Sequence, residues 1–186
     1  MSSSYHRPEL RADLLAATRA LVEAEGTHAV TIARVARACD VSVAAPYRHF
    51  ANKAALLGAV AADGYAALGS EMAAAAGRAG SPADRLVAAG VAYVGFAIAH
   101  PDLFALMFDR DLRDPHPAAH AVLEGLAALI DSQDLAVPPE VALRDAWALA
   151  HGLATLRIGG MATFTRDDSP ARLERDLRGL LSGILR

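Results

Sequence analysis

With 186 residues, of which 54% are hydrophobic, the chain is long enough for one or two small domains with a substantial core. Its single cysteine, Cys39, excludes an intramolecular disulfide framework and a zinc site built from paired cysteines. The polar N-terminus does not resemble a signal peptide, and each apolar segment is interrupted well before the roughly 20 residues that span a membrane. We therefore expect a soluble cytoplasmic protein without a membrane partner.

The formal net charge of −3 is unevenly distributed along the chain. Residues 1–53 contain seven Lys or Arg and five Asp or Glu, which gives +2, whereas the remaining residues contain eleven and sixteen, which gives −5. The basic excess therefore lies in the first third of the chain, where it favours contact with a nucleic acid. This excess is too small to identify a DNA-binding protein by itself.

Every periodic segment predicts a helix, and no stretch alternates as a half-buried strand does. The first helix is expected to begin at Pro8, because proline is favoured in a first turn, and to end before Gly26. Apolar residues recur along it at intervals of four, three and four, at Leu10, Leu14, Ala17 and Leu21. This spacing gives the helix one apolar face.

Residues 31–53, TIARVARACDVSVAAPYRHFANK, predict two short helices separated by a tight turn. Thr31 can cap the first helix, Val41 is expected to be a buried plug in the turn, and Ser42 can cap the second helix. The second helix carries the aromatic and basic residues 47–50. This layout is a helix-turn-helix, in which the second helix can lie in a DNA major groove.

The rest of the chain predicts six more helices, which brings the total to about nine in an all-α fold. Asn52 can cap a long helix that extends to about Ala76. The later helices are expected near residues 82–100, 101–108, 118–131, 138–159 and 170–184.

The segment GRAGSP, residues 77–82, breaks the helical pattern and is the best candidate for a domain boundary. We therefore expect a DNA-binding domain at residues 1–53 and a C-terminal regulatory and dimerisation domain at residues 77–186. The helix at about 53–76 connects them.

The first third, with TIARVARACDVS, YRHF and Lys53, resembles the DNA-binding domain of TetR-family transcriptional regulators. The later segment AWALAHGLATL, with Trp147, His151 and Gly152, resembles the WHG-type C-terminal domain of one branch of that family, as does AAPYRHF. Two motifs in this order, about a hundred residues apart, are far more specific than either alone.

The resemblance implies a homodimer whose two reading helices enter successive major grooves of a palindromic operator, roughly 34–36 Å apart. It also implies a C-terminal pocket whose small-molecule ligand weakens DNA binding. A repressor without catalytic residues, cofactor or metal is therefore expected.

The resemblance assigns phosphate contacts to Tyr47, His49 and Lys53, whose side chains are suitable donors to phosphate oxygens. Thr31 is a helix cap first and a further phosphate contact through the same helix end. The alternative makes Tyr47 a core ring and leaves His49 and Lys53 solvated. Phe50 is expected in the core.

The positions expected to touch bases, Val43, Ala44 and Ala45, are all apolar. They cannot make the paired hydrogen bonds that read guanine or adenine, but they can pack on thymine methyl groups. Specificity is therefore expected to come from thymine contacts, Ser42, Arg48 and DNA shape.

Two residues depart from the family pattern in this region. Asp40 stands where the family commonly has glycine, and it is expected to adopt the left-handed conformation of the turn. Pro46, at about the fourth position of the second helix, gives up one backbone hydrogen bond.

Aromatic residues and methionines at helical spacing in the C-terminal domain are candidates for the walls of a pocket for a mainly apolar ligand. Plain core packing is the alternative, and for Trp147 and His151 it means a core tryptophan stacked on a satisfied histidine. The candidates are Tyr93, Phe96, Phe104, Met107, Phe108, Trp147, His151 and Met161.

Two stripes are candidates for a four-helix dimer interface. One consists of the small residues Ala148, Gly152 and Thr155, which let a second helix approach closely. The other is the apolar face of the last helix, and the alternative is that both stripes face the core of their own chain. Its candidates are Leu173, Leu177, Leu180 and Ile184.

Two other functions remain as alternatives. A small all-helical enzyme would need a catalytic or metal constellation, which only a polar loop with carboxylates and histidines offers, and a solvated loop is the commoner explanation. A module that binds DNA without sequence preference would fit the apolar reading positions. The loop residues are Asp109, Asp111, Asp114, His116 and His120.

Overall fold

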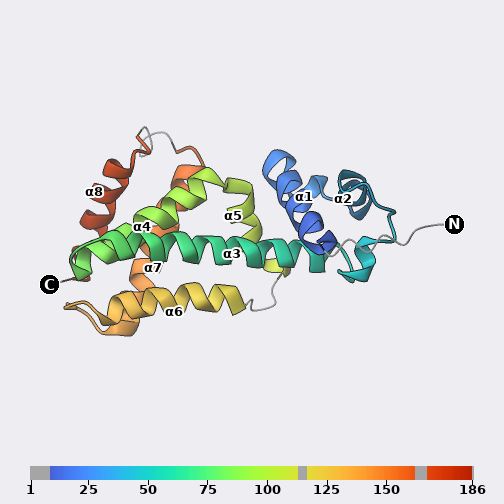
Figure 1. Cartoon of the computed structure of the whole chain (residues 1–186). Helices are drawn as coiled ribbons and strands as arrows, with labels where there is room; N and C mark the ends of the chain where they lie inside the picture. The colour runs from blue at the N-terminus through green and yellow to red at the C-terminus, as the bar shows by residue number, and fades with distance from the viewer. Residues whose placement is uncertain (1–8, 113–116, 162–166, 186) are drawn as a thin grey trace. The chain divides into compact units, whose positions relative to one another are not determined.

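A computed structural model describes residues 9–112, 117–161 and 167–185 of the chain. These residues form eight α-helices, and they contain no β-strand apart from one isolated bridge between Leu135 and Leu185 (Figure 1). The all-α prediction is confirmed. The helices are α1 (Leu10–Glu25), α2 (Ile32–Ala38), α3 (Lys53–Arg78), α4 (Pro82–Ala99), α5 (Pro101–Met107), α6 (Pro117–Asp131), α7 (Pro139–Ile158) and α8 (Pro170–Leu181).

The predicted count of about nine helices is one too high, and the difference lies in the helix-turn-helix. The expected second helix of that motif is a single 3-10 turn, η2 (Pro46–Arg48). Because Pro46 has no N–H to donate to the carbonyl of Ser42, the amide of Ala45 takes that acceptor at 2.9 Å instead. Arg48 likewise donates to the carbonyl three residues before it, at 3.1 Å, which tightens the backbone into a 3-10 turn.

Two of the three predicted helix caps are present, whereas Ser42 does not cap the 3-10 turn η2, which Ala45 precedes and which has no side-chain cap. Thr31 Oγ1 accepts from the amide of Arg34 at 3.2 Å, and Asn52 Oδ1 accepts from the amide of Ala55 at 2.8 Å, so α2 and α3 begin where the sequence indicates. Ser81 and Asp84 form a reciprocal capping box at the start of α4. Hydrogen bonds from Ser81 and Arg178 lower the pKa of the Asp84 carboxyl to about 2.

The described residues fall into two compact units. The first comprises residues 9–64 and 102–112, so that α5 belongs to it together with α1, α2 and the first part of α3. The expected boundary at residues 77–82 lies inside the second unit. In the first unit α5 approaches α3 closely: a Cβ on Gly64 would lie only 2.9 Å from Met107 Sδ, so a larger residue there would require the Met107 side chain to shift. Phe50 is buried here, as predicted.

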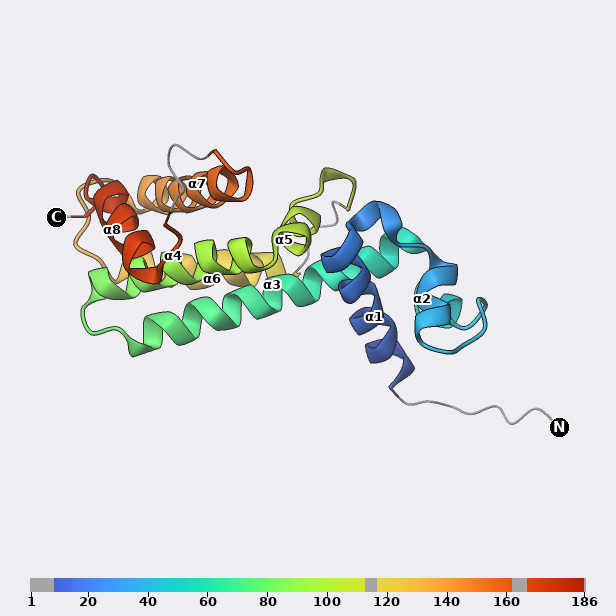
Figure 2. The ribbon, with the colours of Figure 1, turned by 90° about the horizontal axis from the view of Figure 1, so that it is seen from above.

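The second unit comprises residues 65–101 and the described residues from 117 onward. Its central helix is α4, which packs against α6, α7 and α8 (Figure 2). Among the described helices, α4 is long and apolar enough to cross a membrane by length and composition. A core helix meets the same criterion, and α4 has buried residues throughout, including Leu86, Tyr93 and Ala97.

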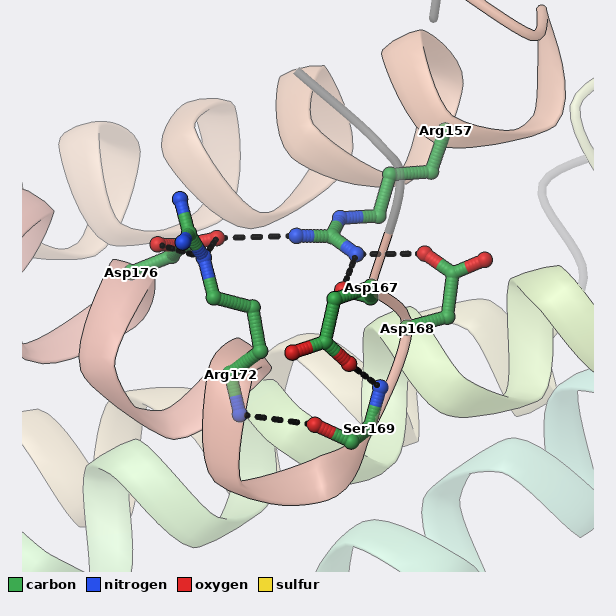
Figure 3. A network of polar contacts seen from close by, with 6 residues as sticks. All are labelled: Arg157, Asp167, Asp168, Ser169, Arg172 and Asp176. Atoms are coloured by element: carbon green, nitrogen blue, oxygen red, sulfur yellow. Dashed lines mark hydrogen bonds and ion pairs between the residues drawn. The ribbon is translucent and has the colours of Figure 1, made fainter.

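A buried arginine fastens α8 to the end of α7 (Figure 3). The side chain of Arg157 has no solvent exposure, and its guanidinium donates to the Asp168 carboxylate, to the carbonyl of Asp167 at 2.8 Å and to Asp176 Oδ2 at 2.8 Å. Arg172 also pairs with Asp176, at 3.0 Å. A lone buried cation is unfavourable, so these acidic partners are what make the position tolerable.

Candidate functional site

The turn of the helix-turn-helix is held in a left-handed conformation at Asp40, with φ of 53°. This confirms the expectation that Asp40 adopts the left-handed conformation of the turn. The amide of Val41 donates to the carbonyl of Ala36 at 3.0 Å, which closes the turn onto α2. Val41 is half-buried, so the prediction of a buried plug is wrong, and the buried side chain beside the turn is Cys39.

The residues that follow the turn form an exposed surface on the first unit. Ser42, Val43 and Ala44 are exposed, and 52% of Val43 is accessible, although it is a large apolar side chain. Ala45 is half-buried and Pro46 is buried. This surface has the composition expected of a face that packs against another apolar group.

The next turn presents its polar residues outward. Tyr47 is 54% exposed, so the alternative that makes it a core ring does not hold. Arg48 and His49 are exposed beside it, whereas the following Phe50 is buried, and the guanidinium of the exposed Arg11 lies 5.5 Å from its ring centroid. The 3-10 turn thus separates a buried anchor from three exposed donors.

Lys53 has a structural contact that the sequence did not indicate. Its Nζ donates to the carbonyl of Thr27 at 3.1 Å and so joins the first turn of α3 to the 3-10 turn η1 (Thr27–Ala29). An ammonium has three donors, so this bond leaves the group able to contact a phosphate.

Arg34 and Glu25 form an ion pair with two hydrogen bonds, at 2.6 and 3.0 Å. The pair raises the pKa of Arg34 and lowers that of Glu25.

The second unit contains a small apolar cavity of about 30 Å³. Of the eight predicted pocket residues, Tyr93 and Trp147 line it, and His151 does not line it but is hydrogen-bonded to Tyr93. The remaining lining residues were not predicted as pocket residues, because aliphatic residues at helical spacing do not distinguish a cavity wall from a filled core. They are Met72, Leu86, Gly90, Val122, Leu123, Leu126, Ala146, Ala150, Leu177 and Leu181.

Five predicted pocket residues do not line this cavity. Phe104, Met107 and Phe108 lie in the first unit, where the two phenylalanine rings pack 4.9 Å apart, because Pro101 restarts the chain into α5 and that helix packs within the first unit. Phe96 is a core residue whose ring lies 5.0 Å from that of His100. Met161 follows the end of α7 and is 55% exposed.

Three polar aromatic residues meet at the edge of the cavity. Tyr93 Oη lies 2.8 Å from His151 Nδ1, and the indole of Trp147 also hydrogen-bonds to Tyr93. Burial raises the pKa of the Tyr93 phenol and lowers that of His151, which favours a protonated phenol and a neutral imidazole near pH 7. We therefore assign the phenol as the donor to Nδ1 and the indole N–H as the donor to the phenol oxygen.

An exposed groove of about 620 Å³ runs between α7 and α8. Ala148, Gly152 and Leu180 of the predicted dimer stripes line it, and Leu180 is 41% exposed. Thr155 is exposed but does not line the groove. The groove is therefore lined by three of the seven residues predicted for the dimer interface.

Three other residues predicted for the dimer interface are buried inside the second unit. Leu173 and Leu177 are 2% and 1% exposed, because this face of α8 packs on α4 and α7 within the same chain, and Ile184, which follows α8, is 4% exposed. A second copy could not reach these side chains, so their assignment to the dimer interface is corrected in favour of the alternative, the core of their own chain.

Two members of the polar loop considered as a metal site, Asp114 and His116, lie outside the described residues. Among the described residues no group of three His, Cys, Asp or Glu side chains is placed to hold a metal ion.

Two family models match the chain. Residues 86–180 match the tetracycline repressor-like C-terminal domain, and residues 14–60 match the bacterial regulatory proteins of the tetR family. The second match contains the whole helix-turn-helix, and the first covers α7 and most of the cavity wall. No curated protein matches the chain.

Solved structures share the whole architecture. A protein of unknown function from Rhodococcus sp. RHA1 is 28% identical over the full length of both chains, with a TM-score of 0.83. A TetR family regulator from Marinobacter aquaeolei VT8 is 15% identical, covers 96% of each chain and has a TM-score of 0.72. The regulator FadR from Bacillus subtilis, solved with stearoyl-CoA, is 14% identical over 93% of this chain and 98% of its own, with a TM-score of 0.68.

Proposed function

Because this chain belongs to the TetR family of bacterial transcriptional regulators, we propose that it is a dimeric repressor, released from a palindromic operator by a small apolar molecule. The observation that carries the proposal is the exposed surface after the left-handed Asp40, where Val43 and Tyr47 are both more than half accessible. Their exposure leaves both side chains available to DNA, as a reading surface requires. A cytoplasmic location follows from this role.

The polar residues of this surface are the proposed phosphate contacts. Tyr47 and His49 are exposed donors, and Lys53 keeps two of its three donors beside the bond to Thr27. Thr31 caps α2, and the free amides of that helix end can meet a phosphate. These contacts would fix the position of the protein on DNA without reading the sequence.

Sequence reading is assigned to the apolar residues of the same surface. Val43 and Ala44 are exposed and can pack on thymine methyl groups, while Ala45 contributes less because it is half-buried. Ser42 and Arg48 add exposed hydrogen-bond donors. Because η2 is a single 3-10 turn, fewer side chains reach the bases than in a longer helix, so DNA shape is expected to carry part of the specificity.

The groove between α7 and α8 is the proposed dimer interface. A Cβ on Gly152 would meet no atom within 4 Å, so the position is open to a helix from a second copy. Ala148 and Gly152 keep the α7 side of the groove shallow, and Leu180 provides an exposed apolar side chain on α8. Two copies related by a twofold axis would bury this surface against itself.

The cavity beside Tyr93 is the proposed effector site, and it lies on the α7 segment that suggests the WHG-type branch of the family. The Bacillus subtilis relative was solved with an acyl-CoA, which supports a partly apolar effector here as well. Trp147 and His151 would then serve both proposed roles, as a cavity edge and as a structural pair.

The direction of regulation is tested in cells. Deletion of the gene should raise the transcripts of genes adjoining the DNA fragments that the protein retains, and re-expression should lower them again. Transcripts that fall on deletion would make the protein an activator. Unchanged transcripts together with turnover of a substrate by the purified protein would favour the enzyme alternative.

A further inference from the structure

The cavity in the second unit offers no charged partner to a ligand. Its described lining residues come from α3, α4, α6, α7 and α8, and none of them is ionisable at neutral pH, since Tyr93 stays a protonated phenol. An ionised carboxylate or ammonium would lose its water there without gaining an opposite charge, which is strongly unfavourable.

The polar atoms at the cavity edge are already engaged with one another. The phenol proton of Tyr93 is directed at His151 Nδ1, 2.8 Å away, and the indole of Trp147 bonds to the phenol oxygen. An anionic ligand could use either donor only by breaking one of these bonds and leaving its partner unsatisfied. An uncharged ligand does not require that exchange.

The cavity is so small that one of its walls has to move when a ligand enters. About 30 Å³ holds roughly two water-sized spheres, so a larger molecule must displace part of the wall. The side chains of α6 provide Val122, Leu123 and Leu126 to the wall. Only Leu126 and Ile130 are buried on α6, compared with seven buried residues on α4, so α6 is held by the less extensive core contact.

We propose that this cavity selects an uncharged, largely apolar molecule, accommodated by displacement of α6, and rejects the carboxylate and ammonium analogues of the same shape. The inference rests on the proposed ligand-responsive function and narrows its effector to neutral compounds. It follows from the absence of charge among the lining residues and from the internal pairing of the aromatic edge.

Trp147 provides the measurement, because it is the only tryptophan in the chain, it lines the cavity and it is 38% exposed. Its emission is recorded at pH 7.4 during titration with primary alcohols of six to fourteen carbons, and with the matching carboxylates and alkylammonium ions, all below their aggregation concentrations. At each chain length the alcohol is expected to saturate the signal at least tenfold more tightly than either ion.

Two variants locate the binding. Leu126→Ala enlarges the cavity and should tighten the alcohols several-fold, whereas Ile158→Ala, at an exposed aliphatic side chain that lines neither the cavity nor the groove, should leave their affinity unchanged. A carboxylate or ammonium that binds as tightly as its alcohol overturns the proposal. Failure of every compound to bind both the natural chain and Leu126→Ala overturns it as well.

The same samples separate this inference from the proposed function. DNA affinity is measured with and without the tightest alcohol on fragments that the protein retains. Saturable neutral binding that leaves DNA affinity unchanged supports the ligand class but contradicts the ligand-responsive repressor. Release of DNA by a carboxylate, with no response to the alcohol, supports the repressor and overturns the ligand class.

Discussion

The phenolic oxygen of Tyr93 and Nδ1 of His151 lie 2.8 Å apart and join α4 to α7 at the edge of the cavity that Trp147 lines. The two residues are 58 positions apart in sequence. The bond therefore connects two helices that contribute to the cavity wall, and its loss should be measurable both in stability and in pH dependence.

Replacing Tyr93 with phenylalanine removes the hydroxyl while keeping the ring. The expected result is a loss of about 1–2 kcal/mol in the free energy of unfolding, because His151 Nδ1 and the Trp147 indole each lose a partner in a partly buried site. Urea denaturation measures this loss. The matched control is Tyr47→Phe on the exposed surface of the first unit, for which a change as large as that of Tyr93→Phe would contradict the account.

Stability should fall on mild acidification. Burial lowers the pKa of His151 below its ordinary value of 6.5, so the unfolded chain binds a proton at a pH where the folded chain resists it. The contribution of the neutral imidazole is thus complete above about pH 6.5 and is lost as the pH falls toward the lower folded-state pKa. The melting temperatures of the natural chain and of His151→Gln should become more alike as the pH falls from about 7.5 to about 5.5. A difference in melting temperature that stays constant over this range would contradict the prediction.

The buried guanidinium of Arg157 should matter far more than an exposed arginine of the same helix. Arg157→Met is expected to destabilise the protein by about 2–3 kcal/mol, less than for a fully buried pair, because Asp168 and Asp176 stay partly solvated at 46% and 23% exposure. Arg144→Met, which removes a pair with Asp145 at a 70% exposed side chain, should change stability by less than about 0.5 kcal/mol. If the two variants lowered the free energy of unfolding equally in urea denaturation, the ion pairs of Arg157 would not be important for stability.

A charge on the outer groove should separate the dimer. Leu180→Glu places a carboxylate on an exposed apolar position that the proposed interface would bury, and sedimentation equilibrium should show at least a tenfold weaker association. Ser182→Glu, exposed on the next turn and outside the groove, is the control and should keep the natural association. Unchanged association of Leu180→Glu would place the interface elsewhere.

Replacing thymine by uracil in an operator tests the reading of methyl groups by Val43 and Ala44. Uracil lacks the methyl but keeps the hydrogen-bonding edge, so removal of the contacted methyls should weaken binding about threefold to tenfold per half-site. Anisotropy titrations at fixed salt measure the change. Equal affinity for the thymine and uracil operators would remove the thymine hypothesis and leave Ser42, Arg48 and DNA shape to explain specificity.

Local rules predicted the parts of the fold that depend on neighbouring residues. Thr31, Asn52 and Ser81 cap helices because their side chains reach amides only three residues away, and Asp40 adopts the left-handed turn for an equally local reason. Pro46 predicted the loss of one backbone hydrogen bond in the second helix, but not the shortening of that helix to the 3-10 turn η2.

Long-range packing escaped prediction because periodicity gives a face but not its partner. The apolar face of α8 was correctly identified, yet Leu173 and Leu177 turn toward their own chain. Phe104 has the spacing of a pocket residue, and only the contacts of α5 place it in the first unit. From the sequence alone Arg157 would be predicted to be solvated, because no sequence pattern indicates its ion pairs with Asp168 and Asp176.

Selection of genomic DNA fragments by the purified protein at about 0.15 M salt, followed by sequencing, tests the central claim most directly. The account predicts a recovered palindrome whose half-sites lie about one helical turn or slightly more apart, bound at least a thousandfold more tightly than unrelated DNA. Recovery of random fragments, with a steep salt dependence and no preferred sequence, would contradict it and favour a non-specific DNA-binding module.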